Sequence, residues 1–201
     1  MGKKSEESRK SYNQMALEYD TSDEGRYTAF HIEELVNTIE LKENDVVLDV
    51  ACGTGTLLGK LNNIKKIHAC GIDISEKMID VARQKYPRIT FKAQPCYPLQ
   101  FEDESIDVIT VCCAFHHFEN PQNFVDECKR VLKKNGRVYI ADPNYSPFVR
   151  FLANTIMFRL TKNGDVKVYS EEELKKFFTK ARFIKVESYK KGLGIFLTAT
   201  K

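Results

Sequence analysis

The chain has 201 residues, of which 42% are hydrophobic and 29% are charged. That length suits one domain with a full core and excludes two complete domains. The composition excludes a disordered, collagen-like or coiled-coil chain. The formal net charge of +3 is well short of the charge that is typical of a nucleic-acid-binding protein.

The cysteines and the apolar runs indicate a compartment. None of the six cysteines forms a C-x-x-C pair, so we expect free, mostly buried thiols in a reducing environment. The N-terminal residues show no apolar signal segment, and no run approaches the roughly 20 apolar residues that a membrane span needs. We therefore expect a cytoplasmic protein without a membrane span.

The N-terminal part is expected to form a helical cap. Its first ten residues are charged and polar, which is typical of a frayed end. Residues 26–39 carry apolar side chains at helical spacing, and this period predicts a helix.

Short apolar runs then alternate with segments of helical period. The runs resemble strands that are buried on both faces of a parallel sheet. Ser75 can cap a helix that Pro87 stops. Asn120 and Pro121 suit the start of another helix, which Gly136 can end. The five predicted strands are 46–50, 67–73, 89–91, 106–111 and 138–141.

The C-terminal part has a different pattern. Residues 147–161 form a strongly apolar helical stretch, which we expect to be buried, to line a pocket or to pair with another subunit. Ser170 and Glu173 form a capping box for the next helix. Residues 183–189 and 195–200, joined by a glycine-containing link, predict an antiparallel hairpin.

Together these elements predict an α/β fold. We expect a Rossmann-like, doubly wound, seven-stranded sheet, mostly parallel with an antiparallel C-terminal hairpin and with helices on both faces. The predicted single domain, 1–201, contains an N-terminal helical cap (1–43), a cofactor-binding half (44–142), and a substrate-shaping insert with the terminal hairpin (143–201). Ligands of such sheets bind beyond the carboxyl ends of the strands.

The loop after the first predicted strand is the main candidate binding site. Gly53 and Gly55 let the backbone turn tightly and let a ligand lie against it. Asp73, 20 residues after Gly53 and at the end of the next strand, can accept hydrogen bonds from both hydroxyls of a ribose. A dinucleotide fingerprint would need glycine where Leu58 stands, so an adenosine cofactor without a pyrophosphate fits better.

At this point the sequence resembles a known family. Residues 46–55 resemble motif I of class I S-adenosylmethionine-dependent methyltransferases, and residues 71–75 resemble the family's ribose-binding segment. Further similar segments are 101–109, 114–118, 131–138 and 169–183. These motifs are similar to the small-molecule branch (methyltransferase domain 11) that includes quinone-biosynthesis methyltransferases. The resemblance implies in-line transfer of a methyl group from S-adenosylmethionine, leaving S-adenosylhomocysteine, to the O, N or C atom of a small, partly apolar acceptor.

The resemblance also implies roles for single residues. The glycine loop would face the methionine part of the cofactor, with Asp49 supporting it, and Asp73 would hold the ribose. Ile74 and Met78 would lie against the adenine, the Cys112 carbonyl would approach the methionine end, and two tyrosines would cover the cofactor. The residues concerned are Tyr12, Tyr19, Asp49, Ala51, Gly53, Gly55, Asp73, Ile74, Met78 and Cys112.

One segment departs from the family pattern. The acid that would contact the adenine amino group after the third strand is missing, and Gln94 stands in that region. Gln94 can supply an acceptor, and the Cys96 N–H can reach a ring nitrogen. We therefore add both residues to the expected cofactor site.

The acceptor side offers fewer signals. His116, ahead of its neighbour His117, is a candidate general base because imidazole titrates near neutrality. The alternative is that one ring packs inward and the other is solvated. Asp142, in a turn after the fifth strand, is a further candidate for the acceptor pocket. No metal site is expected.

Two other functions stay open. Residues 159–191 hold ten basic and five acidic residues, a net charge of +5. This basic C-terminal face could serve an RNA methyltransferase, although a solvated face is the simpler interpretation and we do not expect a nucleic-acid partner. The other alternative is a non-catalytic regulator that binds S-adenosylmethionine. A monomer or a homodimer is expected.

Overall fold

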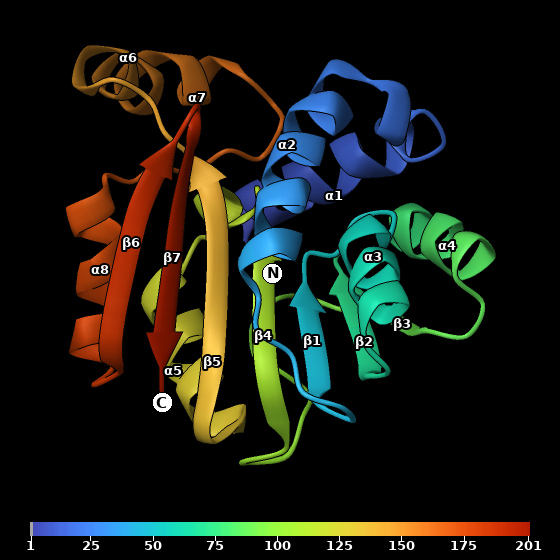
Figure 1. The fold of residues 1–201 in the computed structure, drawn as a ribbon. Helices are drawn as coiled ribbons and strands as arrows, with labels where there is room; N and C mark the ends of the chain where they lie inside the picture. Colours follow the sequence, from blue (N-terminus) through green and yellow to red (C-terminus); the bar gives the residue numbers. More distant parts are fainter. Residues whose placement is uncertain (1) are drawn as a thin grey trace.

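The computed structural model describes residues 2–201, which form a seven-stranded sheet with helices around it (Figure 1). The strand order is β3-β2-β1-β4-β5-β7-β6. Strands β1 to β5 pair in parallel, whereas β7 is antiparallel to both β5 and β6. The predicted fold class is therefore confirmed. The strands are β1 (Val46–Val50), β2 (His68–Asp73), β3 (Thr90–Ala93), β4 (Ile106–Cys112), β5 (Leu132–Pro143), β6 (Ile184–Lys191) and β7 (Gly194–Thr200).

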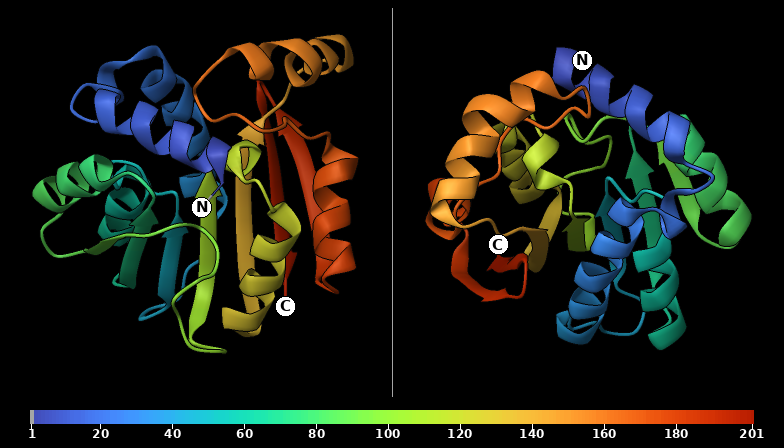
Figure 2. Two further views of the ribbon diagram at one scale, coloured as in Figure 1. Left: turned by 180° about the vertical axis from the view of Figure 1, so that it is seen from behind. Right: turned by 90° about the horizontal axis from the view of Figure 1, so that it is seen from above.

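Helices cover both faces of the sheet, and each face has its own apolar core. Helices α2, α3 and α4 pack on one face, while α5 and α8 pack on the other (Figure 2, left). Alternate strand residues feed the two cores, as Val47 and Leu48 of β1 do. These helices are α2 (Asp23–Thr38), α3 (Thr56–Ile64), α4 (Glu76–Lys85), α5 (Pro121–Val131) and α8 (Glu171–Lys180).

Two predicted helix starts are confirmed by their hydrogen bonds. The Met78 N–H donates to the Ser75 hydroxyl at the start of α4, over 3.1 Å. At α8, Glu173 N–H donates to Ser170 Oγ over 3.2 Å, and Ser170 N–H donates to a Glu173 carboxylate oxygen over 2.8 Å. This reciprocal pair satisfies two backbone donors that a helix start otherwise leaves free.

The N-terminal residues are helical, not frayed as expected. Helix α1 (Lys3–Met15) lies beside α4 across the upper end of the sheet (Figure 2, right). Its Ser5 hydroxyl donates to Glu119 over 2.7 Å, and its Arg9 guanidinium forms an ion pair with Glu76. The helix is held in place by polar contacts to distant residues, which hydrophobic periodicity cannot predict.

Helix α5 ends five residues earlier than Gly136 suggested. It ends at Val131, and β5 begins at Leu132. Leu132 pairs with Ile106 of β4, and the register then shifts before the next pair. A Cβ at Gly136 would lie 2.9 Å from the Lys133 carbonyl oxygen. The glycine therefore permits a tight irregularity in β5 and does not cap the helix.

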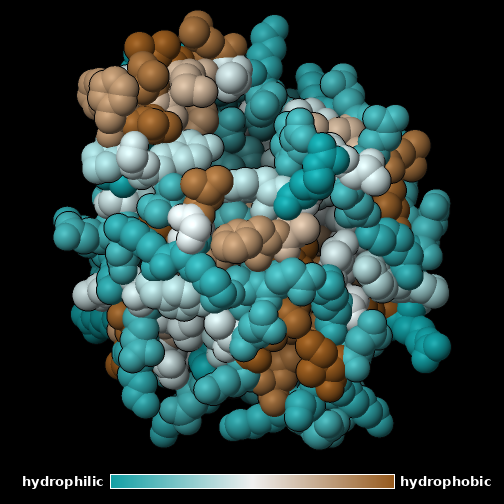
Figure 3. Space-filling model, turned by 45° about the horizontal axis from the view of Figure 1, so that its top comes forward, coloured by the Kyte–Doolittle hydropathy of each residue, from teal (hydrophilic) through white to brown (hydrophobic). Residues whose placement is uncertain are grey.

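The apolar stretch 147–161 is helical, but the expectation that it is buried is wrong. It forms α6 (Pro147–Leu152), a π-helical segment η3 (Ala153–Met157) and α7 (Phe158–Leu160). Phe148, Phe151 and Leu160 are 76%, 65% and 79% exposed. An apolar region lies over this segment at the upper left of Figure 3. Ala153 and Phe158 are its buried members. Among residues 2–201, no helix is both long and apolar enough to cross a membrane.

This exposure gives a simple prediction for stability. Phe151→Gln is expected to change the free energy of unfolding by no more than about 0.5 kcal/mol, because the ring is mostly in water. Phe124→Ala, at a fully buried site in α5, is expected to cost about 3–5 kcal/mol. Urea denaturation of both variants checks this pair. A large loss for Phe151→Gln would show that the ring is covered in solution.

Candidate functional site

The carboxyl ends of three neighbouring strands border a cavity of about 390 Å³. Strand β1 lies between β2 and β4; the chain runs from β1 outward through β2 to β3 and then crosses back to β4 on the other side of β1. Such a switch point opens a crevice. Gly53 follows β1, Asp73 ends β2 and Cys112 ends β4, and all three line the cavity. The volume lies in the range of about 300–1,000 Å³ that small-molecule sites occupy.

The two positions of the loop require glycine for different structural reasons. Gly53 has a φ of +52°, and no other atom of residues 2–201 lies within 4 Å of a Cβ built there. This open side belongs to the cavity, which leaves room for a ligand against the backbone. Gly55, with a φ of +78°, precedes α3, and its Cβ would lie 2.7 Å from the Phe91 ring. Gly55 does not line the cavity; it permits close packing beneath the loop.

Asp73 joins the loop after β1 to the end of β2. Its carboxylate accepts hydrogen bonds from Gly53 N–H over 2.9 Å and from Ser75 N–H over 2.8 Å. A carboxylate has about four acceptor sites, so acceptor capacity is left for a ligand in the cavity. Burial raises the pKa of Asp73 to about 6 against the opposing effect of these backbone donors.

Asp49 lies in β1, just before the loop. It is buried in β1, and the Thr110 hydroxyl of β4 donates to its Oδ1 over 2.6 Å. Burial raises its pKa to about 7. Asp49 lines a second, smaller cavity of about 270 Å³, which also touches Gly53 and Cys112. It therefore lies outside the main cavity and borders a second one beside the same loop.

Two tyrosines from the N-terminal part line the cavity from above. Tyr12 belongs to α1, and Tyr19 starts the short 3₁₀ helix η1 (Tyr19–Thr21). Their ring centroids are 6.0 Å apart in an edge-to-face arrangement. The Tyr19 hydroxyl is 3.0 Å from the Thr28 hydroxyl, which ties η1 to α2. The N-terminal segment thus closes the cavity over the glycine loop.

The other end of the cavity is more apolar. Ile74 and Met78 line it together with Gln94 and Cys96, which follow β3. Gln94 is buried, and its side-chain Nε2 has no hydrogen-bond partner among residues 2–201. A buried amide without a partner costs free energy. It therefore indicates a ligand with a polar edge at this end.

The cavity brings together most of the residues expected from the sequence. Ten of them line it: Tyr12, Tyr19, Ala51, Gly53, Asp73, Ile74, Met78, Gln94, Cys96 and Cys112. Asp49 and Gly55 do not line it. Sequence reasoning missed Ser5, Ser8 and Cys113, which also line the cavity. Ser5 and Ser8 lie in the helix that was expected to be frayed. Cys113 has a φ of +51°, for which its residue type gives no signal.

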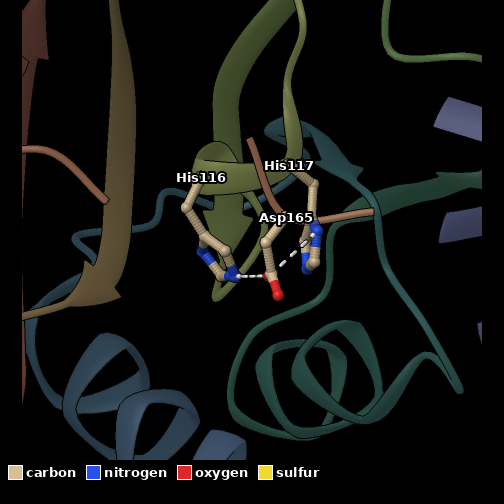
Figure 4. A group of neighbouring side chains, drawn as sticks. All are labelled: His116, His117 and Asp165. Carbon is tan, nitrogen blue, oxygen red and sulfur yellow. Dashed lines mark ion pairs between the residues drawn. The ribbon is translucent and has the colours of Figure 1, made fainter. Parts of the chain in front are cut away.

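The two histidines lie in the 3₁₀ helix η2 (Phe115–His117), directly after β4. His117 lines the cavity, and its Nε2 is 3.1 Å from the Tyr12 hydroxyl. His116 lies behind it, with Nδ1 2.9 Å from an oxygen of buried Asp142. Neither His116 nor Asp142 lines the main cavity, and Asp165 lies against both histidine rings (Figure 4).

Neighbouring charges shift the pKa values of the two histidine rings in opposite directions. Burial lowers the pKa of His116, but the carboxylates of Asp142 and Asp165 outweigh this effect and raise it to about 9. Burial, and then the charge of His116, hold the pKa of His117 well below its usual range. These opposite shifts favour a proton shared with Asp142 on His116 and a neutral His117.

Comparisons with known proteins agree with this geometry. A family model described as a methyltransferase domain matches residues 48–140. A demethylmenaquinone methyltransferase of Chlorobaculum parvum is 34% identical over 105 residues, which cover 52% of this chain and 44% of the relative. One of Symbiobacterium thermophilum is 30% identical over 156 residues, covering 72% of this chain and 61% of the relative. The chain thus spans about half the length of the first of these curated relatives.

A solved structure confirms the fold. The SAM-dependent methyltransferase of Aquifex aeolicus superposes with a TM-score of 0.70 at 23% identity, and the match covers 94% of this chain and 97% of that one. At this identity the similarity concerns the fold alone. The shared architecture includes the seven-stranded sheet whose strand ends border the cavity.

Proposed function

We propose that this chain is a class I S-adenosylmethionine-dependent methyltransferase, which transfers a methyl group from that cofactor to a small, partly apolar acceptor. The observation that carries the proposal is the cavity in which the free side of Gly53, the Asp73 carboxylate and the unpartnered Gln94 amide meet. Each of them suits a different part of the cofactor.

The residues fit the cofactor in one direction along the cavity. The Gly53 backbone and the Cys112 carbonyl face its methionine part, and Asp73 accepts hydrogen bonds from the ribose hydroxyls. Ile74 and Met78 contact the adenine. Asp49 is held by Thr110 of β4 and borders the second cavity beside the loop, and Gly55 keeps the loop packed on Phe91.

Gln94 compensates for the acid that the family has after the third strand. Its amide offers both a donor and an acceptor, so it can pair with the polar edge of an adenine. Its backbone N–H already donates to the Asp73 carbonyl over 2.9 Å, which fixes its position next to the ribose site. The Cys96 N–H supplies a second donor at this end.

The chain's own residues contribute mainly by position. When bound, S-adenosylmethionine supplies a methyl group that its sulfonium already activates. Tyr12 and Tyr19 cover the cavity and exclude water, and an acceptor is held in line beside Cys112 and His117. Such orientation can provide about 7–11 kcal/mol of the reduction in the barrier.

His116 stays our candidate for proton removal from the acceptor, although it does not line the cavity and its raised pKa makes the unprotonated form that could accept a proton the minor form at neutral pH. Its support is its position one residue from His117 and its 2.9 Å contact with Asp142, which orients the ring. His116→Ala tests this role: a large fall in kcat with an unchanged affinity for the cofactor is expected. Normal turnover would exclude the role.

The acceptor is proposed from the lining and from the relatives. Met78, Ala114 and Phe118 make the cavity partly apolar, and two relatives are named demethylmenaquinone methyltransferases. We therefore propose a quinone-type acceptor that is methylated at carbon. Transfer of a labelled methyl group to a short-chain demethylmenaquinone, with and without reduction to the quinol, tests the acceptor class.

Calorimetry tests the whole proposal. Titration with S-adenosylmethionine and with S-adenosylhomocysteine is expected to show one site per chain. The absence of binding at submillimolar cofactor would overturn the proposal, and binding without any turnover across acceptors would favour the regulator.

The RNA alternative has less support, because acidic side chains accompany the basic face. Lys167 pairs with Glu173, Lys175 and Lys190 pair with Glu171, and Lys191 pairs with Glu34. RNA binding that weakens steeply with salt would revive this alternative.

Other sequence expectations also stay proposals. They are the division into cap, cofactor half and insert, a monomeric or homodimeric state, and a cytoplasmic location. The location is supported by six cysteines that are all free.

The pH dependence of cofactor binding follows from Asp73. Its pKa of about 6 means that the carboxyl gains a proton as the pH falls through 6, and it then offers fewer acceptors and no charge. Affinity for the cofactor is therefore expected to fall below about pH 6.

The stability of the fold is expected to depend on pH in the opposite direction. A raised pKa of Asp73 favours the folded state at low pH, and this contribution is lost as the pH rises through 6. Calorimetry and thermal melting between pH 5 and 8 separate the two effects, and Asp73→Asn should remove the pH dependence of binding near 6.

A further inference from the structure

Three potential metal ligands converge beside the cofactor cavity (Figure 4). His116 and His117 are consecutive in η2, and Asp165 belongs to the segment that follows α7. One nitrogen of each ring and one Asp165 oxygen all lie within 4.8 Å of one another. The chain thus brings together two imidazoles and a carboxylate from residues almost 50 positions apart.

The distances suit a shared ion better than direct hydrogen bonds. Asp165 Oδ1 is 3.6 Å from His116 Nε2 and 3.5 Å from His117 Nδ1. Hydrogen bonds between N–H and O span about 2.7–3.2 Å. Two ligands on one tetrahedral zinc ion, each bonded at about 2.0–2.2 Å, lie roughly 3.4 Å apart. Both distances from Asp165 to the histidine nitrogens are therefore within a few tenths of an ångström of this spacing.

Each histidine has a partner on its other ring nitrogen. His116 Nδ1 is 2.9 Å from buried Asp142, which is the carboxylate–histidine arrangement that orients a ligand towards a metal. His117 Nε2 is 3.1 Å from the Tyr12 hydroxyl. With the proton on that nitrogen, Nδ1 has a free lone pair. His117 Nδ1 is buried and has no hydrogen-bond partner among residues 2–201.

The backbone holds Asp165 in place. The N–H groups of Val166 and Lys167 both donate to the His116 carbonyl over 3.0 Å. Gly164 has a φ of +81°, and a Cβ there would lie 2.4 Å from that of Ser8 in α1. The segment is therefore fixed against both η2 and α1, so little conformational entropy is lost when an ion binds.

We propose that His116 Nε2, His117 Nδ1 and an Asp165 carboxylate oxygen bind a divalent transition-metal ion, with zinc the best match to this ligand set. Three protein ligands leave at least one coordination position open. Because His117 lines the cavity, that position is accessible from it. Metal binding at this site does not depend on methyl transfer. Coordination of an oxygen or sulfur atom of the acceptor at the open position, however, rests on the proposed function. As a ligand, His116 would not act as a base.

Metal titration without cofactor tests the site. Chelator-treated protein is titrated with ZnCl₂ in a calorimeter and with CoCl₂ by visible absorption. One ion per chain and the absorption of a four-coordinate cobalt site are expected. Asp165→Asn and His117→Ala should each weaken binding at least 10-fold. The control His68→Ala, at an exposed histidine that starts β2, should bind as the unmodified chain does.

Two results would overturn the proposal: no binding at millimolar metal, or equal affinity in the two ligand variants and the control. Circular dichroism melting shows whether the variants fold. If His117→Ala does not fold, Asp165→Asn still tests the site, because asparagine keeps the shape of the side chain. The cofactor titration is done separately in the presence of a chelator. Failure of the metal site therefore leaves the test of the proposed function intact.

Discussion

Replacing Asp73 with asparagine is expected to raise the Kd for S-adenosylmethionine about 100-fold or more. The carboxylate would accept hydrogen bonds from two ribose hydroxyls, and each bond to a charged group contributes roughly 1.5–3 kcal/mol. Losing about 3 kcal/mol corresponds to about 100-fold in affinity. The side chain also holds Gly53 N–H and Ser75 N–H, so the glycine loop loses part of its support. Isothermal titration calorimetry measures the change directly.

Glu76 provides a matched control for this experiment. It lies three residues away at the start of α4, but it is exposed and pairs with Arg9 and Asn13 outside the cavity. Glu76→Gln removes the same charge near the same loop and is expected to raise the Kd far less than Asp73→Asn does, because it weakens only a contact of α1 and leaves the cavity lining intact. An equal loss of cofactor affinity in both variants would mean that the affinity depends on long-range charge and that Asp73 does not contact the cofactor.

The sheet, and the part of the site that the strand ends form, could be predicted because their sequence patterns are local. The run 46–50 is apolar on both faces, which only a central strand of a covered parallel sheet requires. The glycines follow immediately, and Asp73 ends the neighbouring strand. Since parallel strands in one sheet bring their carboxyl ends to one edge, strand order alone joins Gly53 and Asp73. The hydrogen bond between them then follows.

The position of α1, which covers the site, and the position of Asp165 could not be predicted in the same way. Helix α1 has no apolar stripe, and its contacts join residues more than 60 positions apart, such as Arg9 with Glu76 and Ser5 with Glu119. Asp165 has no spacing signal either, because its relation to His116 arises from the path of the segment after α7. Both features depend on tertiary contacts, which periodicity does not encode.

The stretch 147–161 shows the opposite error. Its apolarity predicts that something should cover it, but the sequence does not say whether the chain itself does so. Burial of Ala153 and Phe158 against Val168 leaves the larger side chains of α6 exposed. Hydrophobicity therefore predicted the helix correctly, but burial within the chain is wrong, and pairing with another subunit stays a prediction.

The two loop glycines are expected to fail in different ways when each is replaced with alanine. Gly53→Ala should weaken cofactor binding at least 10-fold, because the new methyl group enters the open side of the loop. Its positive φ adds a stability cost of about 1–2 kcal/mol. Gly55→Ala has the same backbone cost and also places a Cβ 2.7 Å from buried Phe91, where overpacking typically costs a further 1–3 kcal/mol.

Urea denaturation without cofactor and calorimetry with cofactor separate these effects. The Gly53 variant should fold and bind poorly, whereas the Gly55 variant should lose more stability, and any fraction that stays folded should bind better than the Gly53 variant does. If Gly53→Ala bound the cofactor with unchanged affinity, the loop would not lie against the cofactor. The site would then have to be sought away from the end of β1. The reversed pattern, with Gly55→Ala as the stable variant that does not bind, would mean that the two glycines exchange the roles that their surroundings indicate.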